Sequence, residues 1–232
     1  MVKNHLSRLN APKSWPIKRK GIKFITRPSA GAHCLDEGIS LSLVIKELLK
    51  YAKTLKEVKK ILNEGKILIN NKVRKNHRHN LGIMDIMSIP ELKENYLLVK
   101  NTKGKFRLIK IDDKEAQNKI FRIRDKKILK KGKTQLLFFN GQTKIIEKDS
   151  YKTGDSLLIS FKDGKVSNHL KFEKGANIYV TGGKKVGAIG KLAEVKKIKD
   201  GVENIIIESA GKKVETAKRY AFVIGDLKFE NE

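Results

Sequence analysis

Residues 41–89, LSLVIKELLKYAKTLKEVKKILNEGKILINNKVRKNHRHNLGIMDIMSI, decide the fold that we expect for this chain. Apolar side chains recur at the 3.6-residue period over 41–52 and again over 55–62. Each run predicts a short amphipathic helix whose apolar face packs on another element. After Gly65 the pattern changes to the two-residue alternation of strands. The stretch therefore predicts two helices followed by a β-hairpin.

Local signals mark the ends of these elements. Thr54 and Glu57 have the spacing of a capping box at the start of the second helix, and Gly65 can adopt the left-handed conformation that closes it. Asn70-Asn71 predicts a turn that tolerates positive φ. The chain then returns as a strand toward residues 84–89.

The predicted hairpin tip is basic, and so is the whole chain. Six basic or titratable side chains without an acid among them occupy the tip: Lys72, Arg74, Lys75, His77, Arg78 and His79. The 232 residues contain 52 Lys and Arg against 25 Asp and Glu, a formal charge of +27. Such an excess indicates a polyanionic partner. An anionic membrane is disfavoured, because no apolar run approaches the roughly 18 residues of a spanning helix. Nucleic acid is the better interpretation.

Residues 62–73 and 85–89 resemble the S4-type RNA-binding domain. The sequence departs from the usual pattern at Gly82 and Met84, near which that family has a proline and a glycine. The resemblance implies that the hairpin tip grips RNA phosphate. The alternative is a helix-hairpin scaffold whose charges are merely solvated.

The N-terminal segment 1–39 has three of the four prolines and no sustained helix or strand period, and its first 35 residues hold eight Lys or Arg and no acid. We expect an extended arm that becomes ordered on RNA; the alternative is a disordered leader. Residues 5–21 closely resemble the opening of the S4e family of small-subunit ribosomal proteins, as do 27–33 and 39–41. The RNA-binding candidates here are Arg8, Lys13, Trp15, Lys18, Arg19 and Lys20.

Residues 95–172 have the pattern of strands, which predicted turns separate at Gly104, 140–141, 154–155 and 163–164. Asp112 and Glu115 predict the cap of one short helix. A basic stripe follows, and its RNA-binding candidates are Arg122, Arg124, Lys126 and Lys127. The turns resemble those of the central domain of the S4e family, which implies an all-β module.

Residues 174–192 resemble a KOW motif, a strand-loop-strand element of small SH3-type barrels. Gly183 and Gly187 allow positive φ and close approach of backbone to phosphate, while Lys184 and Lys185 supply charge. Periodicity alone also allows a helix over 191–198, but the family resemblance favours a strand there.

The sequence does not match the signatures of enzymes or metal sites that we considered. Gly182 to Gly187 has the spacing of a phosphate-binding loop, but Ala188 and Ile189 stand where Lys and Ser or Thr must follow. Asp85 lacks the Arg-Leu-Asp setting of pseudouridine synthases with S4 domains. A zinc site is disfavoured, because a single cysteine, Cys34, leaves only His33, His77 and His79 as further ligands. We expect no catalytic residue, cofactor, metal or small-molecule substrate.

These observations predict an α+β multi-module chain: an N-terminal basic arm (1–39), an S4-type helix-hairpin domain (40–94), a central β domain (95–172) and an SH3-type barrel with a KOW motif (173–232). The resemblance implies a structural constituent of the small ribosomal subunit that binds rRNA beside neighbouring ribosomal proteins. The single cysteine and the lack of an apolar secretory signal indicate the cytoplasm. The alternatives are an rRNA-modifying enzyme targeted by its S4 domain, and a transcription or ribosome-associated factor with a KOW barrel.

Overall fold

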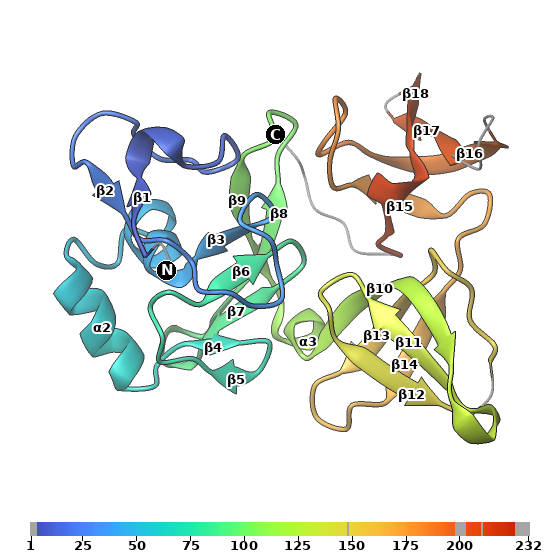
Figure 1. Ribbon diagram of the computed structural model, residues 1–232, viewed down its shortest axis with the longest axis horizontal. Helices are drawn as coiled ribbons and strands as arrows, with labels where there is room; N and C mark the ends of the chain where they lie inside the picture. Colours follow the sequence, from blue (N-terminus) through green and yellow to red (C-terminus); the bar gives the residue numbers. More distant parts are fainter. Residues whose placement is uncertain (1–3, 148, 198–202, 210, 226–232) are drawn as a thin grey trace. The chain divides into compact units, whose positions relative to one another are not determined.

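The computed structural model describes residues 4–147, 149–197, 203–209 and 211–225. The chain divides into two compact units (Figure 1): unit 1 is Met1–Lys100 with Gly104–Lys119, and unit 2 is Asn101–Lys103 with Ile120–Glu232. Both units are mostly β, and α-helix occurs, among the described residues, only in unit 1. The predicted balance of helix and strand is therefore corrected to a mostly β fold with few helices.

Unit 1 is built around a five-stranded sheet of order β5-β4-β7-β8-β9, with two separate pairs, β1-β2 and β3-β6. Its elements are β1 (Leu6–Ser7), β2 (Phe24–Ile25), β3 (Gly38–Ser40), α1 (Leu41–Leu43), a π-helical turn (Val44–Leu48), α2 (Leu55–Asn63), β4 (Leu68–Ile69), β5 (Lys72–Val73), β6 (Asn80–Gly82), β7 (Ile86–Ile89), β8 (Glu94–Lys100), β9 (Phe106–Ile111) and α3 (Asp113–Ala116). Strand β8 pairs with β7 and β9. The sheet thus runs on through residue 95, where the sequence predicts a module boundary.

The first predicted helix differs from expectation. Only Leu41–Leu43 is α-helical, and the chain then widens into a π-helical turn in which the Leu49 N–H donates to the Val44 carbonyl at 3.0 Å. Every residue from Leu41 to Ile45 is buried, so packing surrounds this segment rather than covering one face. The amphipathic pattern therefore does not predict the structure of this segment, because burial on all sides determines its conformation.

The second helix and the turn after it are confirmed. The Thr54 Oγ1 accepts from the Glu57 N–H at 3.3 Å and the Glu57 carboxylate accepts from the Thr54 N–H, which completes the capping box. Asn70 and Asn71 have φ of 50° and 59°. The returning strand β5 is only two residues long, however, and β4 pairs on its other side with β7.

The N-terminal segment is packed rather than extended on its own. Trp15 is 1% exposed, and its indole Nε1–H donates to the Gly38 carbonyl at 2.8 Å. The Phe106 N–H donates to the Ser14 carbonyl at 2.8 Å. Phe24, by contrast, is 50% exposed. Trp15 therefore docks in unit 1 through the chain's own contacts, which corrects the expectation that RNA must order it.

A buried carboxylate, Asp85, holds the parts of unit 1 together. Its Oδ2 lies 3.0 Å from the His33 Nε2 and accepts from the Gly82 N–H at 2.8 Å. Its Oδ1 accepts from the Asn70 Nδ2 at 2.9 Å and from the Lys119 ammonium. Asp85 and Lys119 are each 3% exposed. One side chain thus joins the N-terminal segment, the hairpin turn and the last residue of unit 1.

The departures at Gly82 and Met84 have physical consequences beside Asp85. A Cβ added at Gly82 would lie 2.2 Å from the His33 ring, so the close approach of this histidine requires glycine. Met84 is 2% exposed and has φ of 63°, a region that L side chains seldom adopt. The left-handed backbone at Met84 is strained, and the burial of the Met84 side chain offsets this cost.

Unit 2 contains two five-stranded, barrel-like sheets, of order β12-β11-β10-β13-β14 and β18-β17-β16-β15-β19. The strands are β10 (Asn118–Ile128), β11 (Thr134–Phe138), β12 (Thr143–Ile146), β13 (Ser156–Ser160), β14 (Val166–Leu170), β15 (Asn177–Val180), β16 (Ile189–Lys197), β17 (Glu203–Ser209), β18 (Lys212–Ala217) and β19 (Ala221–Val223), and a 3₁₀ turn, η6, covers Lys218–Tyr220. Each sheet has its own apolar core, one around Ile123 and Leu136 and the other around Ile178 and Ile205.

Local predictions for the strand-rich part are largely confirmed. Gly104, Gly141, Gly154 and Gly164 all have positive φ, as turns require. The helical alternative over 191–198 is wrong, because β16 covers Ile189–Lys197; Ile198 lies outside the described residues. Asp112 is the N-cap residue of α3, as predicted, but its side chain makes no capping hydrogen bond.

Gly187 approaches backbone closely, as predicted, but the backbone belongs to this chain. Its φ is 82°, and an added Cβ would lie 2.5 Å from the carbonyl carbon and oxygen of Asn101. Residues 101–103 belong to unit 2, so this contact ties them to the loop between β15 and β16, residues 181–188, which we call the KOW-like loop.

We expect Asp85→Asn to destabilise unit 1 by about 3–5 kcal/mol at pH 7, because the buried Lys119 ammonium loses its counter-charge. Burial alone would raise the pKa of Asp85, but Lys119 and the His33 and Gly82 hydrogen bonds outweigh it and hold that pKa below its usual range. The carboxylate therefore stabilises the fold above about pH 4, and this stability is lost as pH falls further.

Denaturant unfolding followed by Trp15 fluorescence measures this effect, because Trp15 is the only tryptophan and lies in unit 1. Asp36→Asn, at an exposed position, is the matched control. The double variant Asp85→Asn/Lys119→Met should recover much of the loss. A single variant as stable as the control would contradict the role of Asp85.

Gly187→Val should destabilise unit 2 more than Gly211→Val does. Both glycines have positive φ, 82° and 73°, but an added Cβ at Gly211 meets nothing within 4 Å. The strain of the left-handed conformation, about 1–2 kcal/mol, is common to both. Thermal unfolding followed by circular dichroism compares the two, and equal losses would show that the Asn101 contact is unimportant.

Candidate nucleic-acid interface

The hairpin tip, which we define as residues 70–79, presents cations to solvent. Lys72, Arg74 and Lys75 are exposed, and the segment contains no acidic residue. The left-handed Asn70 and Asn71 turn the chain sharply at the start of the tip. Three neighbouring cations on a short turn form a surface that suits phosphate oxygens.

Arg78 is half-buried and links the tip to the N-terminal segment. Its Nε donates to the Arg27 carbonyl at 3.0 Å and its Nη2 to the Asn4 Oδ1 at 3.3 Å. The Ser29 N–H donates to the Arg78 carbonyl at 2.8 Å. A pocket of about 290 Å³ beside it is lined in part by Arg27 and Arg78. Arg78 therefore joins Asn4, Arg27 and Ser29 to the tip.

His77 and His79 carry little charge at neutral pH. Burial, with the nearby cations Lys59 and Arg78, lowers the pKa of His77 below its ordinary value. Burial and Arg74 lower the pKa of His79, although Asp85 partly opposes this. Both rings are half-buried and neutral at pH 7. The charge of the tip at neutral pH thus comes from its lysines and arginines.

The N-terminal arginines bind the chain's own backbone. The Arg8 guanidinium donates to the carbonyls of Ile22 and Lys18, at 3.2 and 2.9 Å. The Arg19 guanidinium donates to the carbonyls of Ala11 and Pro12, at 2.5 and 2.8 Å. These side chains hold the irregular segment in its folded path.

Three lysines of the same segment face solvent, namely Lys13, Lys18 and Lys20. Trp15, also a sequence-predicted site residue, is buried. The structure therefore separates the N-terminal candidates into exposed lysines, which can meet RNA, and arginines and a tryptophan that stabilise the fold.

The basic stripe of unit 2 also contains both exposed cations and cations that contact the chain itself. The Arg122 guanidinium donates to the carbonyls of Arg219 and Lys218, and the Lys126 ammonium contacts the Asp149 carboxylate at 2.7 Å. Arg124 and Lys127 are exposed. Lys119, three residues before Arg122, belongs to unit 1 and is buried against Asp85.

The KOW-like loop contains four of the predicted RNA-binding residues, Gly183, Lys184, Lys185 and Gly187. Gly183 has φ of 83°, and Lys184 and Lys185 follow it at exposed positions. Gly187 instead meets the backbone of Asn101, as described above. Each unit therefore carries its own group of exposed cations.

Sequence reasoning missed two basic residues of unit 2, Lys218 and Arg219. Arg219 is exposed, with its guanidinium 4.7 Å from the centre of the Tyr220 ring, and both residues line a pocket with Arg122. Their signal in the sequence is weak, a basic pair separated by Tyr220 from the apolar strand β19.

The structure does not gather the side chains that a zinc site would have to use, namely His33, Cys34, His77 and His79. Within the part of the chain that the structure describes, no group of three or more His, Cys, Asp or Glu side chains is placed to hold a metal ion. His33 instead faces Asp85. No described helix has both the length and the apolar character that a membrane span needs.

Comparisons with known proteins agree with this basic, mostly β architecture. Family models described as "Ribosomal family S4e" and "RS4NT (NUC023) domain" match residues 92–166 and 2–36. A small ribosomal subunit protein eS4 from Methanocella arvoryzae is 41% identical over 226 residues, which cover 97% of this chain and 95% of that protein. The eS4 protein of Methanocaldococcus jannaschii is 38% identical over 233 residues, covering 97% and 95% of the two chains.

A solved structure is also similar. The crystal structure of the 30S ribosomal protein S4e from Thermoplasma acidophilum matches with a TM-score of 0.72 and 28% identity, covering 85% of this chain and all of that one. Relatives of about 40% identity along almost the whole length decide the assignment. The chain belongs to the S4e family of ribosomal proteins.

Proposed function

We propose that this protein is a structural constituent of the small ribosomal subunit, which binds rRNA and stabilises its folded form in the cytoplasm. The observation that carries the proposal is its membership of the S4e family along nearly the whole chain. The exposed cations of the hairpin tip and the net charge of +27 support rRNA as the direct partner. Neighbouring ribosomal proteins are the other expected partners, and the role requires no chemistry.

The finer assignments are also our proposal. We assign the S4-type domain to residues 40–94, the central β domain to 95–172 and the KOW domain to 173–232. The α2 helix followed by the β4-β5 turn supports the first assignment, and the strand-loop-strand of β15 and β16 supports the last. Strands β8 and β9 continue the sheet of the first domain, so its packing extends beyond residue 94.

We propose that the exposed cations make the RNA contacts and that the half-buried arginines shape the surfaces that carry them. The proposed contact residues are Lys13, Lys18, Lys20, Lys72, Arg74, Lys75, Arg124, Lys127, Lys184 and Lys185. Phosphate contacts of this kind position a protein on RNA without reading its sequence.

Co-sedimentation tests the proposed role against the enzyme and factor alternatives. A structural constituent should remain with small subunits through moderate-salt washing at near one copy per subunit. A modifying enzyme or a transient factor would be substoichiometric and lost in the wash. Loss of the chain under these conditions would overturn the proposal.

Replacing Lys72, Arg74 and Lys75 with Glu should weaken rRNA binding while leaving the melting temperature almost unchanged, because all three side chains are exposed. If each contacts one phosphate, the slope of log affinity against log salt should become shallower by about three units. Filter binding at several salt concentrations measures both quantities.

The matched control reverses three exposed lysines at α2 and its N-terminal flank, Lys53, Lys56 and Lys60. It changes the net charge by the same amount at another surface of unit 1. Equal losses of affinity in both variants would mean that net charge, and not the tip, governs binding.

Affinity for rRNA should rise as pH falls from 7.5 to 5.5. His77 and His79 have lowered pKa values in the free protein, so they are neutral at pH 7 and gain protons only at more acidic pH. Nearby phosphates favour the protonated rings, so RNA binding takes up protons. The variant His77→Asn/His79→Asn should lose most of this pH dependence, and an unchanged profile would exclude these rings from the interface.

A further inference from the structure

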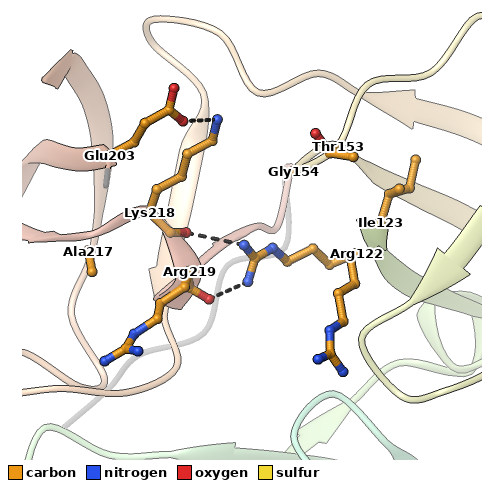
Figure 2. A pocket seen from close by; sticks show the side chains of 9 residues that line it. Arg122, Ile123, Thr153, Gly154, Glu203, Ala217, Lys218 and Arg219 are labelled. Atoms are coloured by element: carbon orange, nitrogen blue, oxygen red, sulfur yellow. Dashed lines mark hydrogen bonds and ion pairs between the residues drawn. The ribbon is translucent and has the colours of Figure 1, made fainter. Parts of the chain in front are cut away.

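Unit 2 contains a pocket of about 520 Å³ with a strongly basic lining (Figure 2). It is bordered by β10, by the turn at Thr153 and Gly154, by the start of β17 and by the end of β18 with η6. Its charged residues are Arg122, Arg124, Lys218, Arg219 and Glu203. Four cations thus face one carboxylate.

Arg122 is fixed in this pocket by backbone carbonyls. Figure 2 shows its guanidinium extended toward residues 218 and 219, where Nη1 donates to the Arg219 carbonyl at 2.5 Å and Nη2 to the Lys218 carbonyl at 3.2 Å. Its Nε is buried and has no hydrogen-bond partner among the described residues. Burial lowers the pKa of Arg122 to about 10, yet the side chain stays charged at neutral pH.

The carboxylate in the lining does not neutralise Arg122. The Glu203 carboxylate accepts from the Lys218 ammonium at 2.5 Å, and Figure 2 shows this pair turned toward each other. Arg219 lies over the Tyr220 ring instead of a carboxylate. In the described part of the chain, no ion pair joins an acid to Arg122, Arg124 or Arg219. The pocket therefore keeps an uncompensated positive charge.

A half-buried guanidinium is costly unless a counter-charge accompanies it. Carbonyl dipoles satisfy two of its N–H groups but supply no net negative charge. An anion in the pocket would supply that charge, and charge-assisted hydrogen bonds from Arg124 and Arg219 would hold it. Ala217 and Thr153 add apolar surface, and the volume exceeds that of a phosphate group alone.

We propose that this pocket binds one phosphodiester of RNA together with part of its nucleoside, as a contact separate from the hairpin tip. The proposal takes its partner from the proposed function. It makes Arg122 a positioning residue that fixes the floor of the pocket, and Arg124 a direct phosphate ligand. A free nucleotide offers the same phosphate chemistry, and the experiment separates the two sources.

Nuclear magnetic resonance of the full-length, ¹⁵N-labelled chain tests the proposal with three probes: adenosine, adenosine 5′-monophosphate and the dinucleotide adenylyl-(3′→5′)-adenosine. We expect the dinucleotide to shift the backbone amide signals of Thr153, Gly154 and Lys218. It should also shift the Nε–H signal of Arg122, assigned by its loss in Arg122→Lys. Adenosine, which lacks phosphate, should leave all of these signals in place.

Arg124→Ala should weaken dinucleotide binding about tenfold, as expected for the loss of one charge-assisted contact. The matched control Lys213→Ala removes an exposed cation from β18 outside the pocket, and should change the affinity less than about twofold. Equal effects of the two variants would overturn the assignment of Arg124.

The remaining outcomes are equally decisive. Shifts with adenosine alone would show a nucleoside site that needs no phosphate, and shifts with the monophosphate but not the dinucleotide would identify a free-nucleotide site; each overturns an RNA phosphodiester. No shift with any probe would mean that Arg122 is only a structural contact. The tip variant should keep the dinucleotide shifts, so failure here and failure of the tip are distinguishable.

Discussion

The buried carboxylate of Asp85 is the constraint on which unit 1 depends. It compensates the buried Lys119 ammonium and accepts hydrogen bonds from the hairpin turn, through Asn70, and from the Gly82 N–H. His33, from the N-terminal segment, lies against its other face. A charge at this depth is tolerated only when every partner is in place. The hairpin tip is therefore anchored by a polar cluster around Asp85. This cluster needs both His33, from the N-terminal segment, and Lys119, the last residue of unit 1.

Arginine and lysine have different tasks in this protein. Arg8, Arg19, Arg78 and Arg122 all donate to backbone carbonyls of segments far away along the chain or of irregular turns. The planar guanidinium offers several donors in a fixed arrangement, so one side chain can satisfy two carbonyls that no strand or helix pairs. Most lysines of the candidate interface remain at the surface. The irregular backbone is thus held by arginine, and the exposed charge comes largely from lysine.

The parts predictable from sequence are those fixed by neighbours along the chain. The capping box at Thr54, the Asn70-Asn71 turn and the positive φ at Gly187 depend on a few adjacent residues, and each is confirmed. The pairing of Asp85 with Lys119 spans 34 residues and that of Trp15 with Gly38 spans 23. Composition marks such residues only as charged or aromatic, so periodicity cannot reveal that they meet.

Because some cations are used inside the fold, the net charge does not give the number of cations that contact RNA. A count of cations treats Lys119 and Arg122 like Lys72, yet the first two are committed to a carboxylate and to carbonyls inside the fold. Only cations that neutralise phosphates release counterions from RNA. The salt dependence of binding should therefore report a smaller number of contacts than the excess of 52 Lys and Arg over 25 Asp and Glu suggests. Lys119, Arg122 and the other arginines that donate to backbone carbonyls instead stabilise an irregular, strand-rich chain whose small cores give limited stability by themselves.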